Sequence, residues 1–461
     1  MPGDIAYTSQ NVTTEELLIQ KEATMKLLRT ILLFALVLSI SLAAAAEEKL
    51  KMGETESKEQ KKCSSYSFKF SGYFKADYSF DQARVSPGDY AIKVLQGPED
   101  EVTNLTARET RIGFDFSWAD EGIRSDAKLE FDFYGLGAAP ASLNSMENKA
   151  TPMLRHAYLK LSKNNWSVLA GQTSDVISPL VPKTVNYTVG WAQGNIGYRR
   201  PQFRLTTWTD LGSGKLTACV AASRTIGHDL DQRWLEGTPD SLLGTGDGID
   251  DGADSPMPTF QGRLGLDMKM GSEGHAAIGV SGHYGREEAR ITTYDLAGGV
   301  LDQESLELES WSVNVDLKLK LSDRVNLSGE FFMGQNLGAY LGGVLQDYGP
   351  DLGELGSMGG WGMLSIVPLE KTLFNVGYCF DDPDEDDFIV PEGASLGMIN
   401  MNSVFFGNIM YSMTKNVTAM IEGSYLKTTY LTKTMSGGVA DSNDLDYDSI
   451  RVQFALKAAI M

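Results

Sequence analysis

A run of alternating basic residues, before the middle of the chain, offers the clearest binding chemistry in the sequence. Arg200, Gln202 and Arg204 recur at every second position, and Arg199 precedes them. In an extended strand every second side chain points to the same face, so these groups share one surface. Guanidinium groups stay charged and bind carboxylates through two parallel hydrogen bonds. The spacing therefore predicts a surface that attracts small anions.

The same alternation places further polar side chains on the face opposite the aromatic residues, where they can join these arginines. The candidate groups are Lys75, Arg111, Lys128 and His156. Acidic residues share that face, so a mixed-charge wall whose arginines only pair with acids is the alternative. The acids are Asp77, Asp115, Glu130, Asp132, Asp316, Glu330 and Glu422.

Catalytic and cofactor chemistry finds little support in the sequence. The four histidines lack the spacing of a metal-binding helix, and no serine stands in a Gly-x-Ser-x-Gly turn. The three cysteines lie far apart, which predicts neither a disulfide framework nor a zinc site. We therefore expect a protein without a cofactor that is not an enzyme. A hydrolase whose serine and histidine meet only in the folded chain is the alternative.

Two acidic stretches are candidates for holding a metal ion. Their carboxylates could bind Ca²⁺ or Mg²⁺ through oxygen and bridge to an anionic lipid surface. Neither stretch has the spacing of an EF-hand loop, so two solvated acidic segments are the alternative. The candidate ligands are Asp247, Asp250, Asp251, Asp254, Asp384 and Asp386.

Charge and hydropathy restrict the partners. The formal net charge is −21, so the chain lacks the basic excess with which proteins bind nucleic acid. After residue 46, no apolar run approaches the roughly 20 residues that a membrane helix needs. If the chain enters a membrane, it must do so as strands.

The elements that position these groups are strands with a period of two. Residues 68–80 alternate phenylalanine, tyrosine and alanine with lysine, serine and aspartate, and residues 111–118 and 126–133 repeat the pattern. Seven short turns alternate with eight long segments rich in glycine, aspartate and proline, which is typical of outer-membrane barrels. The long segments are roughly residues 81–106, 135–152, 174–194, 224–258, 286–308, 336–358, 381–398 and 431–444. These connections predict an all-β transmembrane antiparallel barrel of about sixteen strands, with long extracellular loops and short periplasmic turns.

The N-terminus has the signature of an exported protein. Residues 25–46 combine a basic start, a short apolar run and small residues before Glu47, which predicts a cleaved signal peptide. We interpret residues 1–24 as an upstream extension from a misplaced start; a signal anchor with a cytoplasmic tail is the alternative. Residues 47–65 then form a periplasmic tether and residues 66–461 the barrel.

Six fragments of the first half resemble the DcaP-like outer-membrane porins. They are residues 71–77 (SGYFKAD), 109–115 (ETRIGFD), 127–133 (AKLEFDF), 154–159 (LRHAYL), 169–173 (LAGQT) and 194–204 (GNIGYRRPQFR). The resemblance covers the chain from about residue 66 to its end and implies a sixteen-stranded barrel, a homotrimer and uptake of small anions such as dicarboxylates. The sequence departs from the family in its short segment 47–62 and in a second half without diagnostic fragments.

Together these patterns predict a bacterial outer-membrane porin for passive diffusion of small hydrophilic solutes, in contact with outer-membrane lipid and lipopolysaccharide. The apolar segment 174–194 either folds into the barrel as a constriction or latches over a neighbouring copy. The alternative function is a structural or adhesive barrel whose extracellular loops bind a surface partner.

Overall fold

The computed structural model describes residues 66–135, 150–227, 232–235, 238–245, 251–271, 273–295, 297, 299–349 and 353–460. By its internal contacts the chain falls into two units, Met1–Cys63 and Ser64–Met461, and every described residue belongs to the second. Among these residues no helix is long and apolar enough to cross a membrane.

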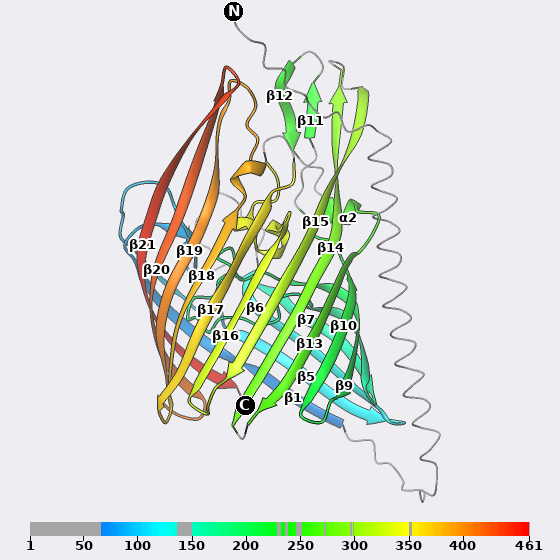
Figure 1. The fold of residues 1–461 in the computed structure, drawn as a ribbon, viewed down its shortest axis with the longest axis vertical. Helices are drawn as coiled ribbons and strands as arrows, with labels where there is room; N and C mark the ends of the chain where they lie inside the picture. Colours follow the sequence, from blue (N-terminus) through cyan, green and yellow to red (C-terminus); the bar gives the residue numbers. More distant parts are fainter. Residues whose placement is uncertain are drawn as a thin grey trace, which may run out of the picture. The chain divides into compact units, whose positions relative to one another are not determined.

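Sixteen antiparallel strands form a sheet that closes on itself (Figure 1). The last strand pairs with the first, from Gly72 opposite Ile460 to Asp81 opposite Arg451. The predicted barrel and its strand number are therefore confirmed. The strands are β1 (Tyr66–Asp81), β5 (Arg111–Asp120), β6 (Ile123–Gly135), β7 (Thr151–Lys163), β8 (Trp166–Ser174), β9 (Arg199–Asp210), β10 (Gly214–Ser223), β13 (Thr259–Met270), β14 (Gly274–Tyr294), β15 (Val300–Lys320), β16 (Val325–Gln335), β17 (Gly356–Leu369), β18 (Thr372–Pro383), β19 (Ser395–Ser412), β20 (Val417–Ser436) and β21 (Val439–Ile460).

Smaller elements decorate the ends of these strands. Strand β4 (Val102–Thr106) pairs with the upper part of β1 and β5 pairs with its lower part, so β4 and β5 together act as one interrupted strand. The others are β2 (Val85–Pro87), β3 (Ala91–Val94), β11 (Gln232–Leu235), β12 (Thr238–Thr245), α2 (Asp251–Asp254) and the short 3₁₀ turns η2 (Gly338–Tyr340), η3 (Gly343–Leu345) and η4 (Glu385–Asp387).

Side chains alternate across the barrel wall as the sequence pattern predicts. In β1, Phe68 and Phe74 are 61% and 60% exposed on the outside, whereas Lys75 and Asp77 are only 4% and 5% exposed. Large apolar side chains are exposed on other strands as well, such as Leu264 of β13 (58%) and Phe405 of β19 (53%). An apolar outer belt around polar inward-facing residues suits a barrel whose outside contacts lipid.

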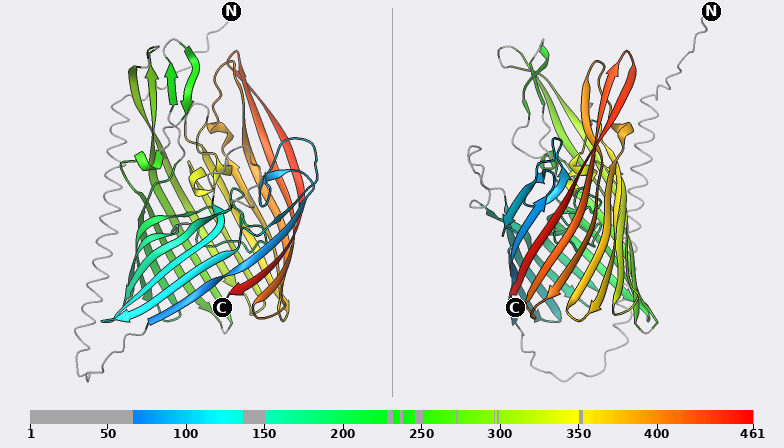
Figure 2. Two further views of the ribbon diagram at one scale, coloured as in Figure 1. Left: turned by 180° about the vertical axis from the view of Figure 1, so that it is seen from behind. Right: turned by 90° about the vertical axis from the view of Figure 1, so that its left-hand side faces the viewer.

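Two segments expected as loops are strands instead. Residues 286–294 pair with 300–309, so β14 and β15 continue as one long hairpin. Residues 431–436 pair with 439–444 and extend β20 and β21 in the same way. Figure 2 shows both hairpins rising above the shorter strands β5–β9. Strand pairing continues here beyond the shorter strands of the barrel. The sequence did not predict it, because the glycine and aspartate content of these segments is typical of loops.

The barrel is not an empty tube, because long connections fold into it. The hairpin of β2 and β3, which we call the inner hairpin, buries Ala91 and Val94 against inward-facing side chains of β17–β20. Val94 also donates its backbone N–H to Thr428 Oγ1 at 2.9 Å. The apolar cluster around the inner hairpin contains Trp361 and Met363 of β17, Cys379 of β18, Val404 and Phe406 of β19 and Leu426 of β20. This side of the lumen is therefore a packed core.

Candidate functional site: the cavity inside the barrel

Residues 175–198, which we call the inner loop, leave β8, cross the lumen and return to β9. Three of their backbone N–H groups donate to side-chain acceptors on other strands of the barrel wall. The pairs are Val176 with Gln261 of β13 (2.6 Å), Leu180 with Glu330 of β16 (2.7 Å) and Val185 with Glu422 of β20 (2.7 Å). This segment therefore folds into the barrel as a constriction, the first of the two alternatives considered for it.

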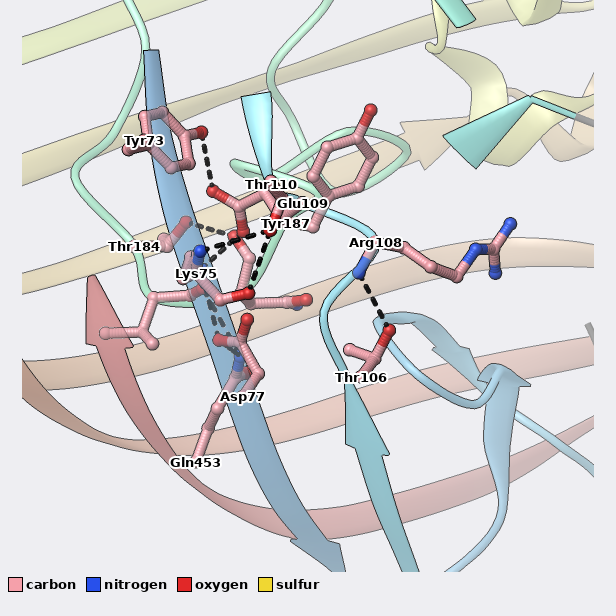
Figure 3. Close-up of polar contacts among 12 residues, drawn as sticks. Tyr73, Lys75, Asp77, Thr106, Arg108, Glu109, Thr110, Thr184, Tyr187 and Gln453 are labelled. Atoms are coloured by element: carbon pink, nitrogen blue, oxygen red, sulfur yellow. Dashed lines mark hydrogen bonds and ion pairs between the residues drawn. The ribbon is translucent and has the colours of Figure 1, made fainter. Parts of the chain in front are cut away.

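Lys75 fixes the middle of the inner loop to the first strand (Figure 3). Its ammonium group donates to the Val185 carbonyl at 2.8 Å, lies 3.1 Å from Asp77 and bonds to Glu109. Gln453 donates to Asp77 at 2.9 Å and completes the junction. Lys75, predicted as a pore residue, thus faces the lumen but is held by two carboxylates and a carbonyl.

Arg200 fixes the start of the inner loop. Its side chain is 0% exposed, its Nε lies 3.0 Å from Asp175 Oδ1, and its guanidinium stacks 4.0 Å above the Tyr340 ring. Tyr340 belongs to η2, so Arg200 joins two connections that fold into the lumen. The sequence placed Arg200 beside the open channel; Asp175 and Tyr340 instead enclose it, because the inner loop folds back over its own strand.

A cavity of about 240 Å³ lies between the inner loop and the wall formed by β5, β7 and β9. Three arginines line it: Arg111, Arg155 and Arg199. Two acids, Glu109 and Asp175, line it as well, but they are paired with Lys75 and Arg200. Neither acid among the lining residues is therefore left to neutralise the three arginines, whose own partners differ.

Arg199 carries the least compensated charge of the three. In the described part of the chain no carboxylate lies within ion-pairing distance of it, although it is only 6% exposed. Its guanidinium lies 4.7 Å from the Tyr198 ring centre and 5.6 Å from that of Trp191. Aromatic faces attract a cation without neutralising it, so Arg199 keeps its charge available to an anion.

The other two arginines share acids of β6. Arg155 pairs with Asp132 at 2.5 Å and with Glu130 at 3.3 Å, and Arg111 lies 3.6 Å from Glu130. Tyr187 of the inner loop also donates to Asp132, at 3.1 Å. Burial raises the pKa of the Tyr187 phenol, and Asp132 adds to this shift, so the phenol stays protonated as a donor.

The remaining predicted pore residues also face the lumen but do not line this cavity. Lys128 lies between Asp115 (3.2 Å) and Glu130 (3.1 Å), and His156 Nδ1 lies 3.0 Å from Thr173 Oγ1. Gln202 donates to the carbonyls of Thr173 and Ser174, both at 3.1 Å. Arg204 donates to Gln202 at 2.9 Å and to the Ser174 carbonyl.

Comparisons with known proteins agree with this architecture. No family model matches the sequence, and no curated protein matches it. Among solved structures, the outer membrane channel DcaP of Acinetobacter baumannii superimposes with a TM-score of 0.59 at 18% identity, over 86% of this chain and 97% of that one. The chain has the DcaP-like porin fold.

Two further structures cover nearly the same part of the chain with lower scores. An anion-selective porin from Comamonas acidovorans has a TM-score of 0.48 at 13% identity, over 86% of this chain and 100% of its own. OmpT, an outer membrane protein of Vibrio cholerae, has a TM-score of 0.49 at 9% identity, over 86% and 98%. The likeness to DcaP is one of fold, and the apolar outer belt of this barrel suits a place in the outer membrane.

The acidic candidates do not form a metal centre within the described ranges, where no group of three or more His, Cys, Asp or Glu side chains is arranged to hold an ion. Asp384 instead accepts the Asp386 N–H at 3.0 Å and caps η4. Asp251 and Asp254 begin and end α2. Asp247 and Asp250 lie outside the described residues.

Sequence reasoning missed an aromatic cluster beside the cavity. The rings of Tyr134 and Tyr187 stack at 3.9 Å, Tyr187 meets Trp191 at 5.8 Å, and Trp191 meets Tyr198 at 6.0 Å. The tyrosines and the tryptophan belong to β6, to the inner loop and to the residue before β9. The only available signal was the aromatic content of residues 187–198, which does not reveal a contact with Tyr134.

Proposed function

We propose that the protein is an outer-membrane porin through which small hydrophilic solutes diffuse passively, with a preference for small anions such as dicarboxylates. The observation that carries this proposal is the cavity at the inner loop, lined by three arginines of which Arg199 has no acidic partner in the described residues. A sixteen-stranded barrel is wide enough to leave an aqueous path beside such a loop.

The preference for anions follows from local charge. A selective pore places fixed charges at its narrow section, where a permeating ion has lost much of its water. Arg199 offers a buried guanidinium that binds carboxylates through its planar fork. The net charge of −21 does not oppose this, because charges more than about 8–10 Å away across water are largely screened at physiological salt.

The decisive experiment is a reversal-potential measurement in planar bilayers. We expect Arg199→Gln to shift the wild-type reversal potential toward cations and to slow dicarboxylate uptake into proteoliposomes. Arg84→Gln is the matched control, because Arg84 is 62% exposed in the connection after β1 and its replacement makes the same change in total charge. A wild-type channel that prefers cations, or equal shifts in both variants, would exclude the anion filter.

A structural or adhesive barrel is the competing function. The hairpins of β14–β15 and β20–β21 extend beyond the barrel and could contact a surface partner. The same bilayer experiment separates the two functions, since an adhesive barrel inserts without conducting.

Processing and assembly complete the proposal. We expect cleavage of residues 25–46, a tether over residues 47–65, and homotrimers embedded in outer-membrane lipid with lipopolysaccharide around the loops. N-terminal sequencing of the mature protein tests the first two expectations. Cross-linking in native membranes tests the trimer.

A further inference from the structure

We infer that the cavity inside the barrel selects hydroxylated carboxylates over carboxylates of the same length that lack hydroxyl groups. This inference rests on the proposed porin function and narrows its substrate class.

Among the described residues, four buried polar atoms without hydrogen-bond partners belong to residues that line this cavity. One of them, Arg111 Nε, lies 3.6 Å from Glu130. The other three are Arg199 Nη2, Ser178 Oγ and Asn195 Oδ1, and their residues are 6%, 8% and 1% exposed. Buried polar groups in folded proteins nearly always have partners, and each exception calls for an explanation. Three exceptions around one cavity indicate that an occupant supplies the missing partners.

The three atoms require both kinds of hydrogen-bonding partner. Arg199 only donates, and Ser178 either donates or accepts. Asn195 Oδ1 only accepts, and the amide nitrogen of the same side chain is already engaged with the Val189 carbonyl at 2.7 Å. A carboxylate satisfies Arg199 and Ser178 but cannot donate to Asn195. The occupant therefore carries a donor in addition to its carboxylate.

The surrounding charge identifies this donor as a hydroxyl rather than an ammonium group. Arg199 lines the cavity without an acidic partner among the described residues, and the two acids of the lining, Glu109 and Asp175, are already paired with Lys75 and Arg200. The positive charge of an ammonium group on the ligand would be repelled by Arg199, whereas a neutral hydroxyl would not.

The position of Arg199 is fixed before any ligand arrives. Trp191 and Tyr198 flank its guanidinium, and their rings contact each other edge to face at 6.0 Å. A preorganised donor loses little conformational freedom on binding, which favours discrimination between similar ligands. A site built to hydrogen-bond a hydroxyl strongly rejects the analogue that lacks it.

The test compares tartrate with succinate, which share a four-carbon dicarboxylate chain and differ in their hydroxyls. The purified full-length protein is inserted into planar bilayers, and each compound is titrated as a blocker of the KCl current. We expect half-block by tartrate at a concentration at least about tenfold lower than for succinate. Equal potency would overturn the inference. The KCl current is recorded before either compound is added, so a protein that never conducts contradicts the porin function separately.

Variants locate the selectivity. Ser178→Ala removes a hydroxyl that makes no hydrogen bond among the described residues, and we expect the potency of both compounds to fall by about threefold. Asn195→Leu should abolish the advantage of tartrate. Asn314→Leu is the matched control, because Asn314 of β15 is also 1% exposed with an unpartnered Oδ1 but does not line the cavity.

Either of two results from these variants would overturn the inference: Asn195→Leu retaining the advantage of tartrate, or Asn314→Leu losing it. If Asn195→Leu does not insert into bilayers, Ser178→Ala alone decides, and an unchanged potency of tartrate in that variant contradicts the assignment.

Discussion

The two sides of the lumen differ in what their inward-facing residues contact. On β5–β9, many of these residues are charged, and three arginines of these strands, Arg111, Arg155 and Arg199, border a cavity. On β17–β20, the corresponding positions hold Trp361, Cys379, Phe406 and Leu426, which pack against the inner hairpin. Both walls alternate with the same period of two, but the described cavity borders the first and the inner hairpin covers the second.

This difference teaches that facing the lumen and contacting water are separate properties of a barrel residue. An apolar patch on the inward face is stable only if another segment covers it. The inner hairpin provides this cover. It also contacts the inner loop directly, because the side-chain amide of Asn186 in that loop donates to the Ala91 carbonyl of the hairpin at 2.9 Å. The packed side therefore supports the loop that shapes the open side.

Removing the inner hairpin should have the largest effect on conductance. Replacing residues 85–94 by a short Gly-Ser linker exposes the apolar cluster of β17–β20 to water and widens the lumen. We expect the single-channel conductance in KCl to rise at least about twofold, because sixteen-stranded barrels enclose a wide space once their interior loops are withdrawn.

A control linker of equal length in the turn at residues 437–438, between β20 and β21, changes an exposed connection only. An unchanged conductance in the hairpin variant would mean that the aqueous path beside β5–β9 alone determines the ion current, and that removing the hairpin from β17–β20 opens no further path.

Breaking the Arg200–Asp175 pair should have the next largest effect. Arg200→Ala leaves the Asp175 carboxylate buried without its cation, a change that costs about 3–5 kcal/mol in comparable buried pairs. We expect a lower urea midpoint of unfolding and noisier open-channel current, since the inner loop loses an anchor. The double variant Arg200→Met with Asp175→Asn removes both charges and should recover most of the stability. A quiet channel in Arg200→Ala would show that the loop is held without this pair.

The barrel was predictable from the sequence because alternation and connection length act locally. The pattern of residues 68–80 sufficed to assign the outer and inner faces of β1. The error at residues 286–308 and 431–444 arose where turn-forming residues lie within long hairpins, since strand pairing can override local preference.

The cavity was only partly predictable. The spacing of Arg200, Gln202 and Arg204 correctly assigns one face of β9, but spacing does not reveal which of these groups the inner loop covers. Arg200 is enclosed by Asp175 and Tyr340, which are 25 and 140 positions away in the chain. Contacts of such separation depend on how the long connections fold, and no local pattern encodes them.

The smallest effect on ion selectivity is expected from replacing Arg204, and it tests how far along β9 the anion-selective region extends. Arg204 faces the lumen, has no acidic partner among the residues described, and lies outside the cavity lining. At a strand rise of about 3.3 Å per residue, its Cα lies roughly 17 Å along β9 from that of Arg199. This separation exceeds the screening length of about 8–10 Å at physiological salt. Arg204→Gln should therefore reduce the anion-to-cation permeability ratio by less than about twofold.

Combining this variant with Arg199→Gln tests whether the two arginines act independently. Sites so far apart usually contribute additively, so the shift in reversal potential of the double variant should equal the sum of the single shifts. Raising the salt concentration should weaken the Arg204 effect more than the Arg199 effect, because Arg199 is buried among aromatic rings and screened less. A larger shift from Arg204 than from Arg199 would place the filter at the middle of β9 rather than at the cavity, and the anion preference would then not depend on the inner loop.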